Sequence, residues 1–137
     1  MVGFVLTLHS YNVYLVLAAA LITGIWGLVI YFTNRKNTEM ASVPRPWNIA
    51  LRVTVVLGLL QGLLGVIMVI FGLKPGGGTG LYYLHYVYGG IVALIVPLAY
   101  LSYTTGGKNP RRDVLIYSIA LLILVAAGVR AWMTGPA

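Results

Sequence analysis

The sequence predicts an all-α integral membrane protein, folded as one antiparallel bundle of four transmembrane helices. Charged residues make up only 8% of the 137 residues, whereas about a quarter of a typical soluble domain is charged. Four apolar stretches are long enough to cross a bilayer, since a spanning helix needs about 20 residues. They cover residues 11–32, 47–72, 81–103 and 113–133. Because they use nearly the whole chain, we expect residues 1–137 to form a single domain within the lipid bilayer.

The connections between these stretches predict the orientation in the membrane. Basic residues gather in or beside the first and third connections: Arg35, Lys36, Arg45, Arg52, Lys108, Arg111 and Arg112. Short basic loops stay in the cytoplasm, so we expect both termini outside, in the inner membrane of a bacterium or archaeon. The net charge of +7 is therefore a topology signal and does not indicate nucleic-acid binding. The first residues lack the basic region and cleavage site of a signal peptide, so none is expected.

Several single residues refine each expected helix. Pro46 suits the first turn of the second helix, and the glycine-rich connection GLKPGGGTG predicts a flexible turn after it. Gln61 lies in the middle of the second stretch, where we expect it to face the bundle and bond another helix. Pro97 predicts a kink in the third helix. Amphipathic aromatic side chains near the stretch ends are typical of interfacial belts, as for Trp47, Tyr82, Tyr83, Tyr86 and Trp132.

The two halves of the chain resemble each other, which predicts two repeated helix pairs. His9 and His85 each open the first helix of a half, and the glycine–valine pairs at 65–66 and 128–129 align. The first and third helices run in the same direction, so both histidines are expected at a similar depth near the outer face.

These two histidines are the candidate cofactor ligands. An ionisable residue inside a membrane is a candidate functional residue, and two imidazoles can supply both axial positions of a haem iron. We therefore expect His9 and His85 to be the metal ligands of one haem b, held between facing helices. Two alternatives stay open: interfacial histidines that bond lipid headgroups, and a histidine that holds a chlorophyll. Since no third ligand is evident and the chain has no cysteine, a zinc, di-iron or cysteine-linked haem site is not expected.

Small and cationic residues surround the two histidines. Gly89 lies one turn below His85, so a flat macrocycle could approach the backbone there. Gly58, Gly62 and Gly65 form a similar small-residue stripe on the second helix. The same glycines could instead permit close helix packing. Arg130 lies at the depth of the histidines and is a candidate partner of a haem propionate, with Lys74 as a second candidate. Each could also be a cation that extends to the membrane surface. Catalytic carboxylates are not expected nearby, since Asp113 and Glu39 belong to the cytoplasmic side.

Three segments resemble a known family. The segment LLQGLLGVIMVIFG, followed by LHYVYGG, resembles the glutamine-to-glycine helix and the histidine helix of haem A synthases, and AAGVRAWMTG is similar to the family's glycine–valine–arginine–x–threonine–glycine end. The resemblance spans nearly the whole chain and implies one half of such an enzyme, with His9 and His85 as paired ligands of one b-type haem. The chain lacks the family's glutamate before a histidine, its outer cysteine pair and its second four-helix unit. The resemblance therefore implies a scaffold that holds haem without oxidising a haem methyl group.

The sequence as a whole predicts a small b-type membrane cytochrome that transfers electrons near the outer face. Its size suggests a subunit of a respiratory or photosynthetic complex, with other membrane subunits or redox proteins as partners. We expect an electron carrier and not an enzyme. Two alternatives remain: a cofactor-free structural subunit of such a complex, and a haem-modifying enzyme related to haem A synthase.

Overall fold

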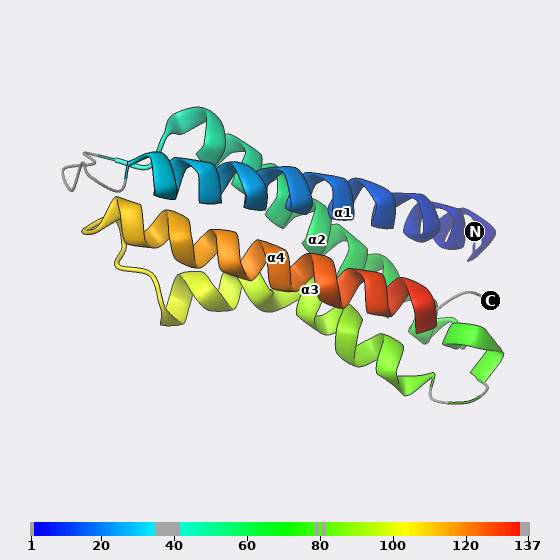
Figure 1. The fold of residues 1–137 in the computed structure, drawn as a ribbon. Helices are drawn as coiled ribbons and strands as arrows, with labels where there is room; N and C mark the ends of the chain where they lie inside the picture. Colours follow the sequence, from blue (N-terminus) through cyan, green and yellow to red (C-terminus); the bar gives the residue numbers. More distant parts are fainter. Residues whose placement is uncertain (1, 35–41, 79, 81, 135–137) are drawn as a thin grey trace.

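A computed structural model describes residues 2–34, 42–78, 80 and 82–134. Four long helices and one short 3-10 helix make up this part of the chain: α1 (Val2–Thr33), α2 (Arg45–Ile70), η1 (Pro75–Gly78), α3 (Tyr83–Ser102) and α4 (Pro110–Thr134). The long helices lie side by side, and consecutive helices run in opposite directions (Figure 1). Each is long and apolar enough to cross a membrane. The predicted antiparallel bundle of four transmembrane helices is confirmed.

The helix boundaries differ most from the prediction at the start of the chain. Helix α1 begins at Val2, well before the predicted residue 11, so His9 lies inside the helix. No proline interrupts this segment, and its backbone can form helical hydrogen bonds from the start. Helix α4 begins at Pro110, a residue suited to a first turn because it needs no N–H partner there. Part of the glycine-rich connection, predicted to be flexible, forms η1.

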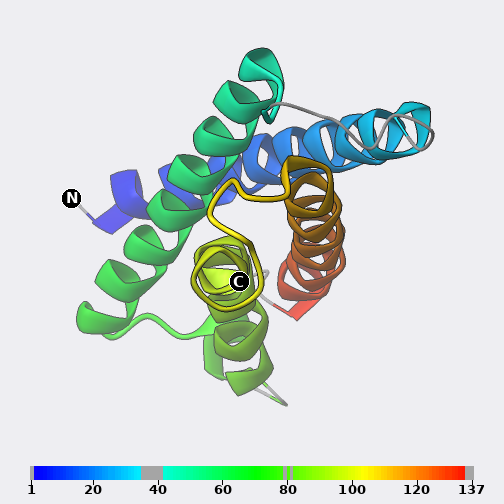
Figure 2. The same ribbon diagram turned by 90° about the vertical axis from the view of Figure 1, so that its left-hand side faces the viewer.

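The helices are arranged in a ring. Helices α1 and α3 each pack against α2 and α4, so α1 lies diagonally opposite α3. Figure 2 shows that α2 crosses α1 at a clear angle. The first and last described residues lie at the same end of the bundle as η1 (Figure 1). We call this end of the bundle the histidine end. The opposite end, here called the basic end, contains the connection between α3 and α4. Arg35, Lys36 and Glu39 lie outside the described residues.

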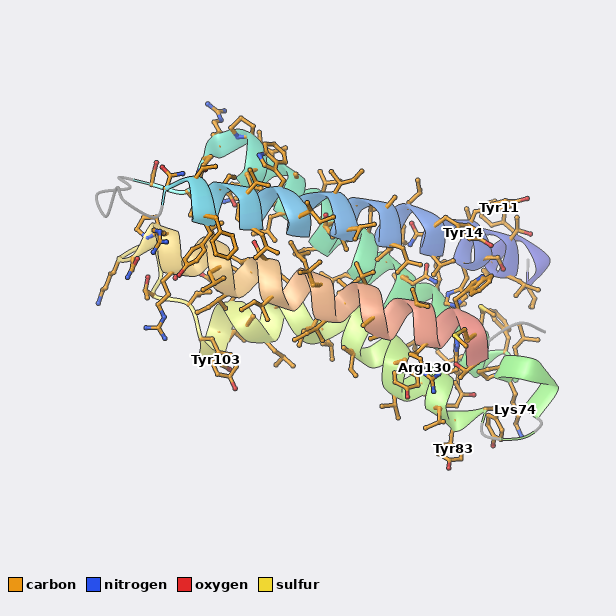
Figure 3. The ribbon with its side chains drawn as sticks, viewed as in Figure 1. Tyr11, Tyr14, Lys74, Tyr83, Tyr103 and Arg130 are labelled. Atoms are coloured by element: carbon orange, nitrogen blue, oxygen red, sulfur yellow. The ribbon has the colours of Figure 1, made fainter. Side chains whose placement is uncertain are left out.

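Aromatic side chains occupy both ends of the bundle. Tyr11, Tyr14 and Tyr83 are exposed at the histidine end, and Tyr103 is exposed at the basic end (Figure 3). Aromatic rings with a polar group are favoured at the two membrane–water interfaces. Their separation along the bundle therefore agrees with a chain that spans a bilayer.

Trp47 corrects one of these aromatic predictions. It was expected in the interfacial belt, but its side chain is fully buried against α1. The indole Nε1 donates a hydrogen bond to the backbone oxygen of Thr23, at 2.9 Å. Gly27 gives space on α1 to both Ser118 and Trp47: an added Cβ there would meet the Ser118 Oγ and lie 3.0 Å from the indole Cζ2. Trp47 is therefore a core residue that joins α2 to α1.

The connection between α3 and α4 is organised by Asp113. This carboxylate is 2% exposed and accepts hydrogen bonds from the backbone N–H groups of Thr105, at 2.8 Å, and Gly107, at 3.1 Å. It also accepts a bond from the Thr105 hydroxyl. The Asn109 Oδ1 accepts a bond from the Arg112 N–H, as an N-cap residue does. The acidic residue of α4 therefore has a structural role at the basic end.

We expect Asp113→Ala to lower the free energy of unfolding by about 2–3 kcal/mol. The substitution removes a charged acceptor and leaves the backbone N–H groups of Thr105 and Gly107 without that partner. The loss of a charged acceptor and the loss of a partner for an N–H group each cost of order 1–3 kcal/mol. Denaturation of the purified protein in detergent micelles would measure the change. Ser102→Ala, at an exposed position at the end of α3, is the matched control. Equal stability of the two variants would contradict the role given to Asp113.

Candidate cofactor site

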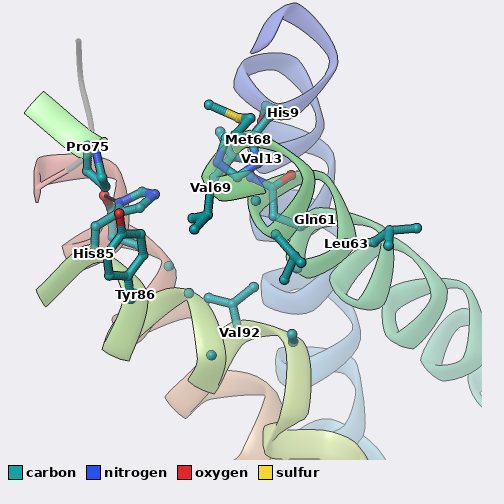
Figure 4. A pocket seen from close by; sticks show the side chains of 18 of the residues that line it. His9, Val13, Gln61, Leu63, Met68, Val69, Pro75, His85, Tyr86 and Val92 are labelled. Carbon is teal, nitrogen blue, oxygen red and sulfur yellow. Dashed lines mark hydrogen bonds between the residues drawn. The ribbon is translucent and has the colours of Figure 1, made fainter. Parts of the chain in front are cut away.

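A cavity of about 770 Å³ lies at the histidine end and is lined by residues of all four long helices. Ligand sites in proteins typically measure about 300–1,000 Å³, so this cavity is large enough for a cofactor. Most of its lining is apolar, and both histidines belong to it (Figure 4). The predicted site residues Gly62, Gly65 and Gly89 also line it.

His9 and His85 reach the cavity from diagonally opposite helices. Their ring centroids are 6.1 Å apart, and the ring planes are inclined by 65°. Two imidazoles that share one metal atom each place a nitrogen about 2 Å from it, and because each nitrogen lies about 1 Å from its own ring centroid, the two centroids lie about 6 Å apart. The observed separation is therefore compatible with a single metal atom between the two rings.

His85 is oriented by the last turn of α4. Its Nδ1 lies 2.7 Å from the backbone oxygen of Ala131. Carbonyl groups in the last turn of a helix have no intrahelical N–H partner, so this oxygen can accept a bond from the imidazole. An N–H at Nδ1 leaves the lone pair on Nε2, which is the form in which a histidine binds a metal. The contact thus holds His85 ready to act as a ligand through Nε2.

His9 is held through its backbone by a pair of buried amides. The Gln61 Nε2 donates to the backbone oxygen of His9 at 3.0 Å, and its Oε1 accepts a bond from the Asn12 Nδ2 at 2.9 Å. Asn12 also donates to the backbone oxygen of Leu57, at 3.1 Å. These bonds connect α1 to α2 directly below the histidine. The prediction that Gln61 faces the bundle and bonds another helix is confirmed.

Asn12 supports the site through its bond to Gln61, and the sequence analysis missed it. It is 6% exposed, and it lies three residues after His9, on the same side of the helix. Asn12 could have been found in the sequence as a lone amide within an apolar stretch. An amide inside a membrane needs a hydrogen-bonding partner, so it is expected to face another helix.

The glycines around the histidines have different surroundings. A Cβ added at Gly89 or Gly90 would meet no atom within 4 Å, so both border open space beside His85. A Cβ at Gly65 would lie 3.5 Å from the His9 Cε1, in ordinary contact with the ring. At Gly62, by contrast, it would lie 2.8 Å from the Ala93 Cβ. Gly62 therefore permits close packing of α2 on α3, whereas Gly65 and Gly89 leave room at the site.

The two candidate cations lie differently from the prediction. Arg130 does not line the cavity; it is exposed, with its guanidinium carbon 5.7 Å from the centroid of the Tyr88 ring. Lys74 does line the cavity, and its ammonium nitrogen lies 5.7 Å from the centroid of the Tyr82 ring. Both lie at the histidine end (Figure 3). The sequence placed Arg130 at the correct end but could not give the side of α4 on which it lies, so Lys74 is the better placed cation.

Within the described ranges, no three histidine, aspartate or glutamate side chains come together at one point. The site therefore offers two imidazoles, an apolar cavity with glycine on two sides, and one lysine. This donor set fits a porphyrin, which supplies four ligands of its own and needs only two axial ones. No protein-family model, curated protein or solved structure matches the chain.

Proposed function

We propose that the protein is a small b-type membrane cytochrome, in which His9 and His85 hold one haem b for electron transfer. The observation that supports this best is the pair of imidazoles, with centroids 6.1 Å apart, at a cavity of about 770 Å³ inside a helix bundle. When bound, a haem supplies reversible one-electron oxidation and reduction at its iron. The resemblance of the sequence to one half of a haem A synthase supports the same proposal.

Several residues in and beside the cavity have a defined task in this proposal. The bond from His85 to the Ala131 oxygen directs Nε2 toward the metal, and the amide pair below His9 fixes α1 against α2. Gly89 leaves room for the edge of the macrocycle beside His85. The Lys74 ammonium would pair with a propionate carboxylate, since a charge-assisted bond of this kind is stronger than a neutral one. The lining is mostly apolar, and such a shell would influence the potential of the iron.

The distribution of charge suggests where electrons are exchanged. Arg45, Lys108 and Arg112 lie on or beside connections remote from the histidines, and short basic loops remain in the cytoplasm. The histidine end would then face the outside of a bacterial or archaeal inner membrane. The haem would lie near the outer surface, where redox proteins or other membrane subunits could exchange electrons with it.

An optical spectrum of the protein purified in detergent tests the proposal. We expect a sharp α band in the reduced-minus-oxidised spectrum, with haem b identified by extraction and its pyridine complex. A colourless protein would overturn the proposal and favour a cofactor-free structural subunit. A chlorophyll absorption spectrum, with magnesium in place of iron, would show that the histidines hold a chlorophyll. Extraction of a modified haem would favour a haem-modifying enzyme.

Gly89→Leu tests whether the open space beside His85 receives the cofactor. Forced packing of extra atoms into a fitted site costs about 1–3 kcal/mol, so we expect the affinity for haem to fall about 5- to 150-fold. The fold should remain intact, because a side chain at this position meets open space. Gly3→Leu is the matched control, since Gly3 is also unobstructed but does not line the cavity. Haem titration of both variants, with melting in detergent, measures the difference; equal haem affinity would contradict the assignment.

A further inference from the structure

The two imidazoles differ in the hydrogen-bond partner of Nδ1, the nitrogen that would not bind the metal. The Nδ1 of His85 has the Ala131 oxygen at 2.7 Å. The Nδ1 of His9 is buried, and it has no hydrogen-bond partner within the part of the chain that the structure describes. Gln61 donates to the backbone oxygen of His9 and leaves the ring unsupported. The repeat therefore supplies two histidines, but only one of them has the support typical of a metal ligand.

This difference predicts unequal ligand strength. A hydrogen bond at the non-ligating nitrogen fixes the tautomer and orientation of a histidine and raises its basicity, and loss of such a bond typically lowers metal affinity about 10- to 100-fold. A buried nitrogen without a partner also carries a desolvation cost, about 1–3 kcal/mol, which is recovered when the ring moves to a polar environment. Both effects weaken the bond from His9 relative to the bond from His85.

We propose that His85 anchors the haem and that His9 is an exchangeable axial ligand. Dissociation of His9 opens one coordination position, on the α1 side, for a small neutral diatomic molecule of the carbon monoxide type. With haem bound, the His9 nitrogen would leave the ferrous iron first and the neutral molecule would take its place, so one bond would break, one would form and the oxidation state of the iron would not change. This inference rests on the proposed function and adds ligand binding to electron transfer.

The surroundings of His9 are compatible with movement of its ring. Gly65 presents no side chain to the imidazole, and a Cβ there would still lie 3.5 Å from the His9 Cε1. The backbone of His9 stays tied to α2 through Gln61, so the ring can turn while the helix keeps its place. His85, by contrast, can leave the iron only by breaking its bond to α4 or by moving with it.

Carbon monoxide binding to the reduced protein tests this asymmetry. In the wild type we expect a binding rate that reaches a plateau as the carbon monoxide concentration rises, because dissociation of His9 becomes limiting. In His9→Ala we expect haem to be retained without the sharp α band, and the rate to increase in proportion to concentration. In His85→Ala we expect the affinity for haem to fall about 10- to 100-fold below that of His9→Ala.

Each possible failure has a separate meaning. Wild-type protein that binds haem but not carbon monoxide overturns the exchangeable ligand and leaves the cytochrome proposal standing. Haem affinity in His85→Ala equal to that in His9→Ala overturns the anchoring role of His85. Wild-type protein without haem overturns both proposals. Melting in detergent identifies a variant that does not fold. The wild-type carbon monoxide rate then decides: a plateau supports exchange of His9, and a rate that stays proportional to concentration contradicts it.

Discussion

Trp47→Ala is expected to lower the free energy of unfolding by about 3–5 kcal/mol, the usual cost of removing a large buried aromatic side chain. The indole of Trp47 is fully buried, packs beside the Tyr117 ring, and donates a hydrogen bond to the Thr23 oxygen. Its loss would leave a cavity between α1, α2 and α4 and a carbonyl oxygen without this donor. Denaturation in detergent micelles, followed by circular dichroism, would measure the change.

Two further variants separate the contributions of volume and hydrogen bonding. Trp47→Phe keeps most of the volume and loses the indole N–H, so we expect a smaller loss, about 1–2 kcal/mol. Trp26→Ala is the control, because Trp26 is 38% exposed on the surface of α1. If Trp26→Ala destabilised the protein as much as Trp47→Ala, the central role given to Trp47 would be wrong.

Gly65→Leu is expected to displace the His9 ring, and under the proposed function this would remove the sharp α band while His85 still held the haem. The Cβ of any residue at this position fits at 3.5 Å from the His9 Cε1, but the remaining atoms of leucine would occupy the space of the ring. Gly65→Ala is the matched control, since its single added carbon makes only an ordinary contact. Absorption spectra of the reduced variants measure the effect, and an unchanged α band in Gly65→Leu would show that His9 does not lie where the leucine must go.

The fold could be predicted from the sequence because the bilayer allows few alternatives. In lipid, each backbone N–H and C=O must be satisfied within the protein, so a long apolar run has to be a helix. The same reasoning predicted that His9 and His85 lie at the same end of the bundle, since the first and third of four antiparallel helices run in the same direction. The structure brings these rings to a centroid separation of 6.1 Å.

What could not be predicted was the rotation of each helix about its own axis. Position along the sequence gives depth in the membrane, but the side on which a residue lies depends on its neighbours. Trp47 is buried because Gly27 leaves space for it on α1, and Arg130 lies over Tyr88 and not at the cavity. Apolar residues occur on all sides of these helices, so periodicity in the sequence did not distinguish the inner side from the outer one.

The bond between Asn12 and Gln61 has a consequence for how the bundle assembles. In the sequence alignment of the two halves α4 is the counterpart of α2, and α1 packs against both helices. With the alignment of the halves, the counterparts of this pair are Tyr88 and Leu124, and Gln61 is the single glutamine of the sequence. Because α4 has Leu124 at the position that corresponds to Gln61, α2 and not α4 offers Asn12 an amide partner at this level. The amide pair therefore fixes which side of α1 faces α2, since placing α4 on that side would leave the two amides without each other.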